Sequence, residues 1–366
     1  MIDNDDPDAV VDARLVAEAA VPVRGPARRW SGGGWIVPGV GPEVFALGTD
    51  LAVSATFPVP EELPRCSPER PAREEDYRVD VSPDGRWAVF AGTDRTVVVD
   101  TDGRVVWRMA HPSFRDRDGD LVPAAAVFRP DGSALWAFVS AGDPSSPDTG
   151  ARATGAERHV VSVADWRVTA VVPSAYTGLP PGDIVVHPGG DLVGFAGAHR
   201  YGVEGFYTYA YEGFWVRCDD TSEAVLSTGD WCPLEVSPDG RRWIGQTGST
   251  PVIGDFADGV VIEPDRAPFT TDDEEEEEDV EADSACFVTS ELVVAAGGLW
   301  ENRHVFADAL TLRRVASIEY PPSEDDHYAV WVGGDGDGTW MTSTGRAPWE
   351  PGAVRLRRWE FDGAHE

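Results

Sequence analysis

Short runs of apolar residues alternate along this chain of 366 residues with short polar turns. The clearest turn, Ser82-Pro83-Asp84-Gly85-Arg86, returns as Ser237-Pro238-Asp239-Gly240-Arg241, and weaker copies occur at 129–132 and 187–190. Each copy separates two apolar runs, which predicts a strand, a tight turn and a returning strand. The prolines of the four copies, at 83, 130, 188 and 238, are 47, 58 and 50 residues apart. A repeat of this length predicts radially arranged β-sheets, because a single four-stranded unit cannot bury both of its faces alone.

The pattern predicts an all-β fold, a seven-bladed β-propeller built of four-stranded antiparallel blades. The clearest blade has strands expected at 78–81, 87–91, 96–101 and 104–109, joined as hairpins by tight turns. The seven blades are expected at 30–57, 76–110, 124–173, 183–228, 233–264, 284–320 and 328–361. Six or eight blades are the alternatives.

The seventh unit lacks one strand, and residues 14–23 can supply it. We therefore expect the N-terminal strand to pair with the C-terminal blade and close the ring, within one propeller domain that spans 14–361. Residues 1–13 are predicted to be a flexible acidic N-terminus. The acidic run at 271–283 cannot pack, because its charges repel each other, and it predicts a disordered loop between two blades.

The Ser-Pro-Asp-Gly-Arg turn precedes an apolar strand and the hairpin sequence Val-Val-Val-Asp-Thr-Asp-Gly at 97–103. This combination resembles the blades of TolB-type and WD-repeat-like propellers. The resemblance is strong at 76–110 and 233–264 and looser over the rest of the repeat. It implies a scaffold or interaction role and transfers no catalytic residue to this sequence.

The formal net charge is −34, and all 30 basic residues are arginine. Such a surface repels phosphate backbones and anionic lipids, so we expect neither a nucleic acid nor a membrane as partner. A cationic partner agrees with the charge, but simple solubility is the favoured explanation. The arginine bias and the acidity together indicate either a GC-rich bacterial genome or adaptation to salt.

The four cysteines are widely separated and form no Cys-x-x-Cys pair, so the sequence contains neither a zinc knuckle nor a redox motif. The N-terminus lacks the basic and apolar regions of a signal peptide, and no apolar run of about 18 residues occurs. We expect a monomeric cytoplasmic protein with reduced thiols.

In a propeller, the loops between blades and the loops between second and third strands share one rim around the channel mouth. Loops on a rigid scaffold carry function more often than strands do, so this rim is the expected binding surface. The alternative is that any propeller rim is polar. The candidate binding residues are His111, Asp116, Asp118, Asp120, His199, Arg200, Trp231, Trp300, Arg303, Asp325 and His327.

The segment Asp116-Arg117-Asp118-Gly119-Asp120 has the alternating oxygen ligands and the glycine of a calcium loop. The bidentate glutamate of an EF-hand is missing, so a solvated acidic turn is favoured and Ca²⁺ at Asp116, Asp118 and Asp120 is the alternative. We predict no other cofactor. No decisive catalytic motif occurs, which favours a non-enzymatic scaffold for a protein or peptide partner. The alternative is an enzyme, or a small-molecule or metal binder, that uses acidic and histidine residues at the channel mouth.

Overall fold

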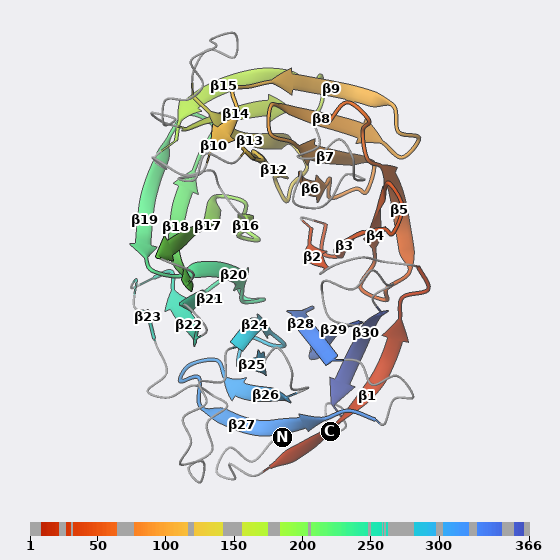
Figure 1. Cartoon of the computed structure of the whole chain (residues 1–366), viewed down its shortest axis with the longest axis vertical. Helices are drawn as coiled ribbons and strands as arrows, with labels where there is room; N and C mark the ends of the chain where they lie inside the picture. The colour runs from red at the N-terminus through yellow and green to blue at the C-terminus, as the bar shows by residue number, and fades with distance from the viewer. Residues whose placement is uncertain are drawn as a thin grey trace. The chain divides into compact units, whose positions relative to one another are not determined.

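The computed structural model describes residues 9–21, 27–30, 32–63, 77–115, 121–141, 156–174, 184–203, 206–247, 250–257, 259, 261–262, 282–297, 303–321, 328–345 and 355–361. Throughout this part of the chain the regular structure is β-strand, and it contains no helix (Figure 1). The all-β prediction is therefore confirmed. The chain divides into two compact units, one of residues 29–48 and 53–232 and the other of 1–28, 49–52 and 233–366.

The larger unit is built from four-stranded sheets in which each strand pairs with the next along the chain. These sheets are β2(Arg28–Arg29) to β5(Val53–Pro58) through β3(Trp35–Pro38) and β4(Glu43–Leu47); β6(Arg78–Val81), β7(Trp87–Ala91), β8(Arg95–Asp100) and β9(Val105–Ala110); β12(Ala125–Phe128), β13(Ala134–Ser140), β14(Ala156–Ser162) and β15(Arg167–Pro173); and β16(Ile184–Val186), β17(Leu192–Val203), β18(Phe206–Cys218) and β19(Glu223–Gly229). A two-stranded sheet, β10(Phe114–Arg115) and β11(Leu121–Val122), completes the unit.

The other unit contains one four-stranded and one eight-stranded sheet. The first is β20(Cys232–Val236), β21(Arg242–Thr247), β22(Thr250–Asp255) and β23(Val261–Ile262). The second follows the order β24(Ala282–Phe287), β25(Leu292–Gly297), β26(Arg303–Asp308), β27(Arg314–Glu319), β1(Val10–Glu18), β30(Arg355–Phe361), β29(Thr339–Gly345) and β28(Tyr328–Gly334). Five sheets of four strands and one of eight are thus present, where seven separate blades were predicted.

The repeated Ser-Pro-Asp-Gly sequence forms the predicted hairpin turn. Ser82 N donates to the carbonyl of Trp87 at 2.9 Å, and Asp84 accepts hydrogen bonds from the Ser82 hydroxyl and the Arg86 amide. Gly85 has φ of 69°, which glycine adopts at little cost. The same bonds recur around Asp239 in the second copy. The aspartate of the motif therefore stabilises the turn that the sequence predicted.

Two carboxylates tie the first strand of one sheet to the first strand of the next. Asp80 Oδ2 accepts a hydrogen bond of 2.7 Å from the backbone amide of Phe128, and the Asp80 side chain is buried. In the other unit, Glu235 Oε2 accepts one of 2.8 Å from the amide of Phe287. Asp80 and Glu235 both stand two residues before the serine of the turn motif. Two acidic residues of the repeat thus have a structural role inside their own unit.

Apolar residues from facing sheets form the core of each unit. One cluster joins Val89 and Val98 of β7 and β8 to Leu135 and Val161 of β13 and β14. The largest fully buried side chains include five tryptophans, Trp35, Trp136, Trp215, Trp243 and Trp340. Face-to-face packing of successive sheets is the arrangement that the repeat predicted.

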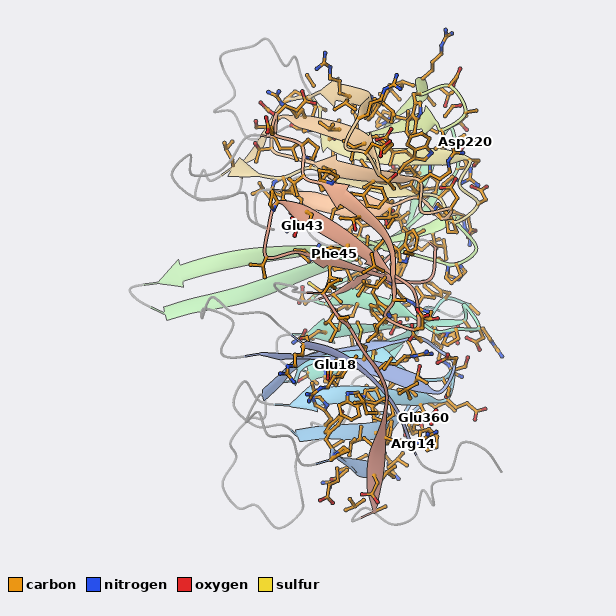
Figure 2. The ribbon with its side chains drawn as sticks, turned by 90° about the vertical axis from the view of Figure 1, so that its right-hand side faces the viewer. Arg14, Glu18, Glu43, Phe45, Asp220 and Glu360 are labelled. Carbon is orange, nitrogen blue, oxygen red and sulfur yellow. The ribbon has the colours of Figure 1, made fainter. Side chains whose placement is uncertain are left out.

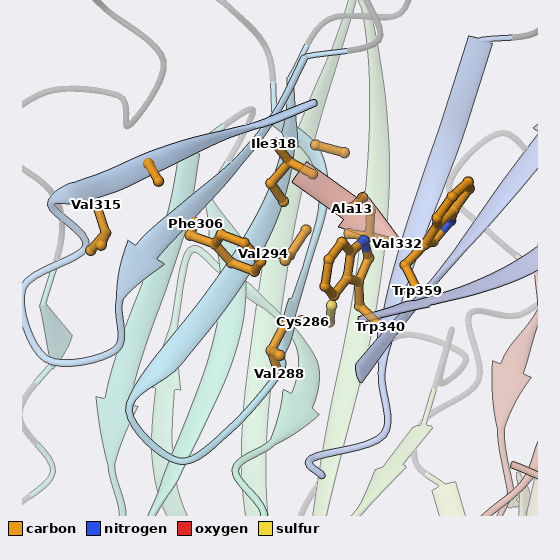
Figure 3. Packing of buried hydrophobic residues seen from close by; sticks show 12 residues of the cluster. Ala13, Cys286, Val288, Val294, Phe306, Val315, Ile318, Val332, Trp340 and Trp359 are labelled. Carbon is orange, nitrogen blue, oxygen red and sulfur yellow. The ribbon is translucent and has the colours of Figure 1, made fainter. Parts of the chain in front are cut away.

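Strand β1 lies inside the eight-stranded sheet, between β27 and β30. Residues 13–18 pair antiparallel with β30, as expected for an N-terminal strand on the last blade. Residues 10–12 also pair, in parallel, with β27, which was not predicted. Figure 3 shows Ala13 beside Trp340 and Val332 in the buried cluster of this sheet. The strand covers Val10–Glu18, whereas residues 14–23 were predicted. It begins earlier because Ala13 packs in this core.

Two predicted terminal or loop segments are only partly described. Residues 10–13 of the expected flexible N-terminus belong to β1, and 1–8 lie outside the described residues. Ala282 and Asp283 of the expected acidic loop 271–283 belong to β24, and its remainder lies outside the described residues.

Candidate functional site

His111, one of the predicted rim residues, is buried and hydrogen-bonded inside the fold. Its Nδ1 lies 3.1 Å from the carbonyl of Pro112 and its Nε2 lies 3.3 Å from the hydroxyl of Thr96. Because the carbonyl can only accept, Nδ1 carries the proton and Nε2 accepts from Thr96. Burial lowers the pKa of His111 from its ordinary value, against the opposing effect of the Pro112 carbonyl. Both ring nitrogens are engaged within the fold.

Trp231 is also buried, and it covers a pair of glycines. Gly213 of β18 and Gly229 of β19 are cross-strand neighbours. A Cβ atom at Gly213 would collide with the carbonyl oxygen and ring of Trp231, and one at Gly229 would collide with its indole nitrogen. The indole therefore packs directly on the backbone of two strands, and both positions require glycine.

Three further candidates lie in strands where loops were predicted. His199 and Arg200 belong to β17, in register with Ala210 and Tyr209 of β18, and Arg303 begins β26 opposite Gly297. The remaining candidates, Asp116, Asp118, Asp120, Trp300, Asp325 and His327, lie outside the described residues. The segment 116–120, where a solvated acidic turn was favoured and a calcium loop was the alternative, therefore also lies outside the described residues. The rim set is thus not assembled into one site by the described part of the chain.

The hairpin that carries His199 and Arg200 is much longer than the others of its unit. Twelve residue pairs join β17 to β18 without a register shift, from Leu192 with Arg217 to Val203 with Phe206. Strand β16 pairs only with residues 193–195 of β17, and β19 pairs only with 213–218 of β18. The two strands project beyond the rest of their sheet as a two-stranded ribbon (Figure 2). We call residues 196–203 and 206–212 the ribbon.

The described aspartates with lowered pKa values lie in tight turns. Asp219, between β18 and β19, accepts bonds from the Ser222 hydroxyl, the Thr221 amide and the Thr221 hydroxyl, which hold its pKa well below the ordinary value. The pKa of Asp131 is lowered as well, because the bonds from Ser133 outweigh the desolvation that raises it. These carboxylates act as hydrogen-bond acceptors for turns.

Sequence reasoning missed a buried ion pair between two sheets. Arg158 of β14 and Glu223 of β19 have 0% and 1% exposed side chains, and Arg158 Nε lies 2.7 Å from Glu223 Oε1. Arg158 Nη2 also donates to the carbonyls of Asp219 and Ser222, and the guanidinium lies over Trp136. No local pattern distinguishes these residues from exposed strand charges, because the two are 65 residues apart.

The described cysteines are enclosed in the fold. Cys218, Cys232 and Cys286 are all buried. Burial raises the pKa of the Cys218 thiol to about 12, although the nearby Arg158 lowers it. A protonated, enclosed thiol is a poor nucleophile.

The part of the chain that the structure describes contains no cluster of three or more His, Cys, Asp or Glu side chains suited to a metal ion. Within the same residues, no helix is long and apolar enough to span a membrane.

Comparisons with known proteins define the fold. No protein-family model matches this chain, and no curated protein matches its sequence. The crystal structure of the Cps50 (Swd1) beta-propeller domain from Myceliophteria thermophila superposes with a TM-score of 0.53 and 12% identity, over 94% of this chain and 99% of that one. A chain of the mitotic checkpoint complex gives 0.53 and 10% identity, over 95% of both chains.

The chain folds as a β-propeller. Sequence identity this low establishes the fold and carries no residue roles. The blades are the four-stranded antiparallel sheets described above, so the blade-level resemblance found in the sequence is supported at the level of fold.

Proposed function

We propose that this β-propeller is a non-enzymatic binding scaffold whose acidic, aromatic-bearing rim binds a protein or peptide partner. In this proposal the propeller has seven blades, with β24 to β27 as the sixth and β28 to β30 plus β1 as the seventh. The three-residue parallel pairing of β1 with β27 then links two blades that are otherwise distinct. In this arrangement the loops of the rim provide the binding surface.

The proposal rests chiefly on the positions of the ionisable groups whose pKa values are shifted. Catalytic sites gather groups with shifted pKa values into one cleft. Here the described groups with shifted pKa values each owe the shift to burial, or to hydrogen bonds and charges within their own sheet. They are Arg95, His111, Asp131, Cys218, Asp219, Asp239, Tyr320 and Asp337. Such groups stabilise the fold, which favours a binding role over catalysis.

The choice of partner rests on fold and charge. One structural neighbour belongs to a multiprotein complex by its own description. A net charge of −34 attracts cations and repels nucleic acids and anionic lipids, so we propose a cationic protein or peptide as partner. The proposal further takes the protein to be a cytoplasmic monomer that needs no cofactor. At Asp116, Asp118 and Asp120 the proposal favours a solvated acidic turn, and a bound calcium ion is the alternative.

The test uses rim and control variants that change the charge equally. The rim variant combines Asp116→Asn, Asp118→Asn and Asp120→Asn, and the control combines Glu61→Gln, Asp102→Asn and Glu291→Gln, which are exposed residues. Each tagged protein is used to capture partners from a lysate of the source organism, and the captured material is washed at about 150 mM salt. The retained partner is then purified, and its affinity for each variant is measured by titration. We expect at least tenfold weaker binding for the rim variant and unchanged binding for the control.

Two results would overturn the proposal. Equal binding by the rim variant and the wild type would remove the rim from the partner surface. Turnover of a metabolite that Asp118→Ala or His327→Ala abolishes at unchanged stability would make the protein an enzyme.

A further inference from the structure

The ribbon is held at its base by a rigid contact. Trp231 covers Gly213 and Gly229 at the place where β19 stops pairing with β18. Beyond this point eight residues of β17 and seven of β18 continue as a regular antiparallel pair. At roughly 3.3 Å per residue this extension is about 25 Å long. A long ribbon thus begins at a closely packed base.

Both edges of the ribbon lack a neighbour among the described strands. Toward the tip, β16 pairs no further than residue 195 of β17, and β19 pairs no further than residue 213 of β18. An isolated two-stranded hairpin is marginally stable in water, and each open edge presents unpaired amides and carbonyls. Such an edge is a template for a further strand. The backbone of the ribbon can therefore accept an additional β-strand at either edge.

Tyrosine recurs along one strand of the ribbon. Tyr207, Tyr209 and Tyr211 occupy alternate register positions of β18. Their cross-strand partners are Gly202, Arg200 and Ala198, so two of the three tyrosines stand opposite the smallest residue types. The aromatic ring of tyrosine attracts the cations of arginine and lysine.

We infer that the ribbon binds an extended, basic segment of the partner protein, which adds to a ribbon edge as a further strand. The open edges offer backbone hydrogen bonds to such a segment, and the three tyrosines attract its arginine or lysine residues. The net charge of −34 raises the local concentration of a cationic peptide. This inference rests on the proposed function and names both the docking element and the chemistry of its partner.

The experiment uses three synthetic peptides of 12 residues on the full-length protein at 150 mM salt. The probe repeats Arg-Val six times and can form a strand. A second peptide repeats Arg-Pro and has the same charge, but it cannot donate backbone hydrogen bonds at its prolines. The third repeats Glu-Val. We expect the Arg-Val peptide to bind at least tenfold more tightly than either of the others.

Two protein variants locate the binding. One replaces residues 199–210 with Asn-Gly, which keeps the Ala198–Tyr211 pair and a hairpin at the base, and the other combines Tyr207→Ser, Tyr209→Ser and Tyr211→Ser. Both should lose at least fivefold in affinity for the Arg-Val peptide while the melting temperature changes by less than about 2 °C. Bound peptide should also slow amide hydrogen exchange in 196–203 or 206–212.

The outcomes separate this inference from the proposed function. Equal binding of the Arg-Val peptide by the shortened variant would overturn the ribbon as docking element and leave the acidic scaffold standing. Equal affinity for the Arg-Val and Arg-Pro peptides would overturn strand addition. No binding of either basic peptide to the wild type would overturn the inference and the cationic partner together.

Discussion

At the scale of single residues, charges inside this propeller are retained where a partner compensates them. The Arg158–Glu223 pair is fully buried, and the Ser174 hydroxyl donates to Glu223 Oε2. Ion pairs on the surface, such as Arg167 with Asp165 at 3.7 Å, remain solvated and contribute little. The burial of a charge, and not its presence in the sequence, decides its effect on stability.

We predict that Arg158→Met destabilises the protein by about 3–5 kcal/mol, because it leaves Glu223 buried without a cation. The double variant Arg158→Met/Glu223→Met should lose much less than the sum of the single variants. Urea unfolding measures all three, and Arg167→Met serves as control with a loss below about 1 kcal/mol. Additive losses would show that the pair is not coupled.

We predict that His111 makes the fold sensitive to acid. Burial lowers the pKa of His111 below its ordinary value of 6.5. Below that pH the unfolded chain takes up a proton that the folded chain does not, so the free energy of unfolding decreases as pH falls. Urea unfolding at pH 7.5 and 5.5 should therefore show a larger loss for the wild type than for His111→Gln. Equal losses would contradict the prediction.

At the scale of elements, the sequence predicted most strands and turns but misjudged two of them. The Pro-Asp-Gly turns were recognisable because a local rule, glycine at positive φ, fixes them. The bounds of β1 were not, since its position depends on Ala13 fitting among Trp340 and Ile318, far away in the sequence. The length of the ribbon was missed because residues 199–200 were expected in a loop, although the alternation at Tyr207, Tyr209 and Tyr211 indicated a strand.

The glycine pair beneath Trp231 leads to a test of element packing. Gly229→Ala would meet the indole, whereas Gly213→Ala would also meet the backbone carbonyl of Trp231. We expect both to destabilise the wild type, and Gly229→Ala to cost clearly less in a Trp231→Ala background. Gly213→Ala should cost nearly the same in both backgrounds. A double-mutant cycle from urea unfolding measures the difference.

Strand β1 leads to a second test. Deletion of residues 1–18 exposes the edge of β30 and removes Ala13 and the Glu18–Arg357 ion pair of 2.9 Å. The side view places Arg14 next to Glu360 on the same pair of strands (Figure 2). We expect the melting temperature to fall by at least about 5 °C. Deletion of residues 1–8 is the control, and an equal effect from both would contradict a role of β1.

At the scale of the whole molecule, the dominant property is the large negative net charge. A net charge of −34 repels itself in the compact state, and added salt screens that repulsion. We predict a higher melting temperature at 0.5 M than at 20 mM NaCl, with most of the rise below about 0.3 M. An equal osmolarity of sucrose provides the control. A melting temperature independent of salt would contradict a destabilising role of the charge.

The sequence by itself determined the all-β class, the repeat, the turns and the overall acidity, because strand alternation and turn chemistry are local and charge is a sum over residues. The tertiary structure alone decided which polar residues became internal. His111 and Trp231, two residues of the predicted binding rim, are both buried. Asp80 and Glu235 gained buried amide partners 48 and 52 residues away. Such pairings depend on which sheets face each other, and no short stretch of sequence specifies that.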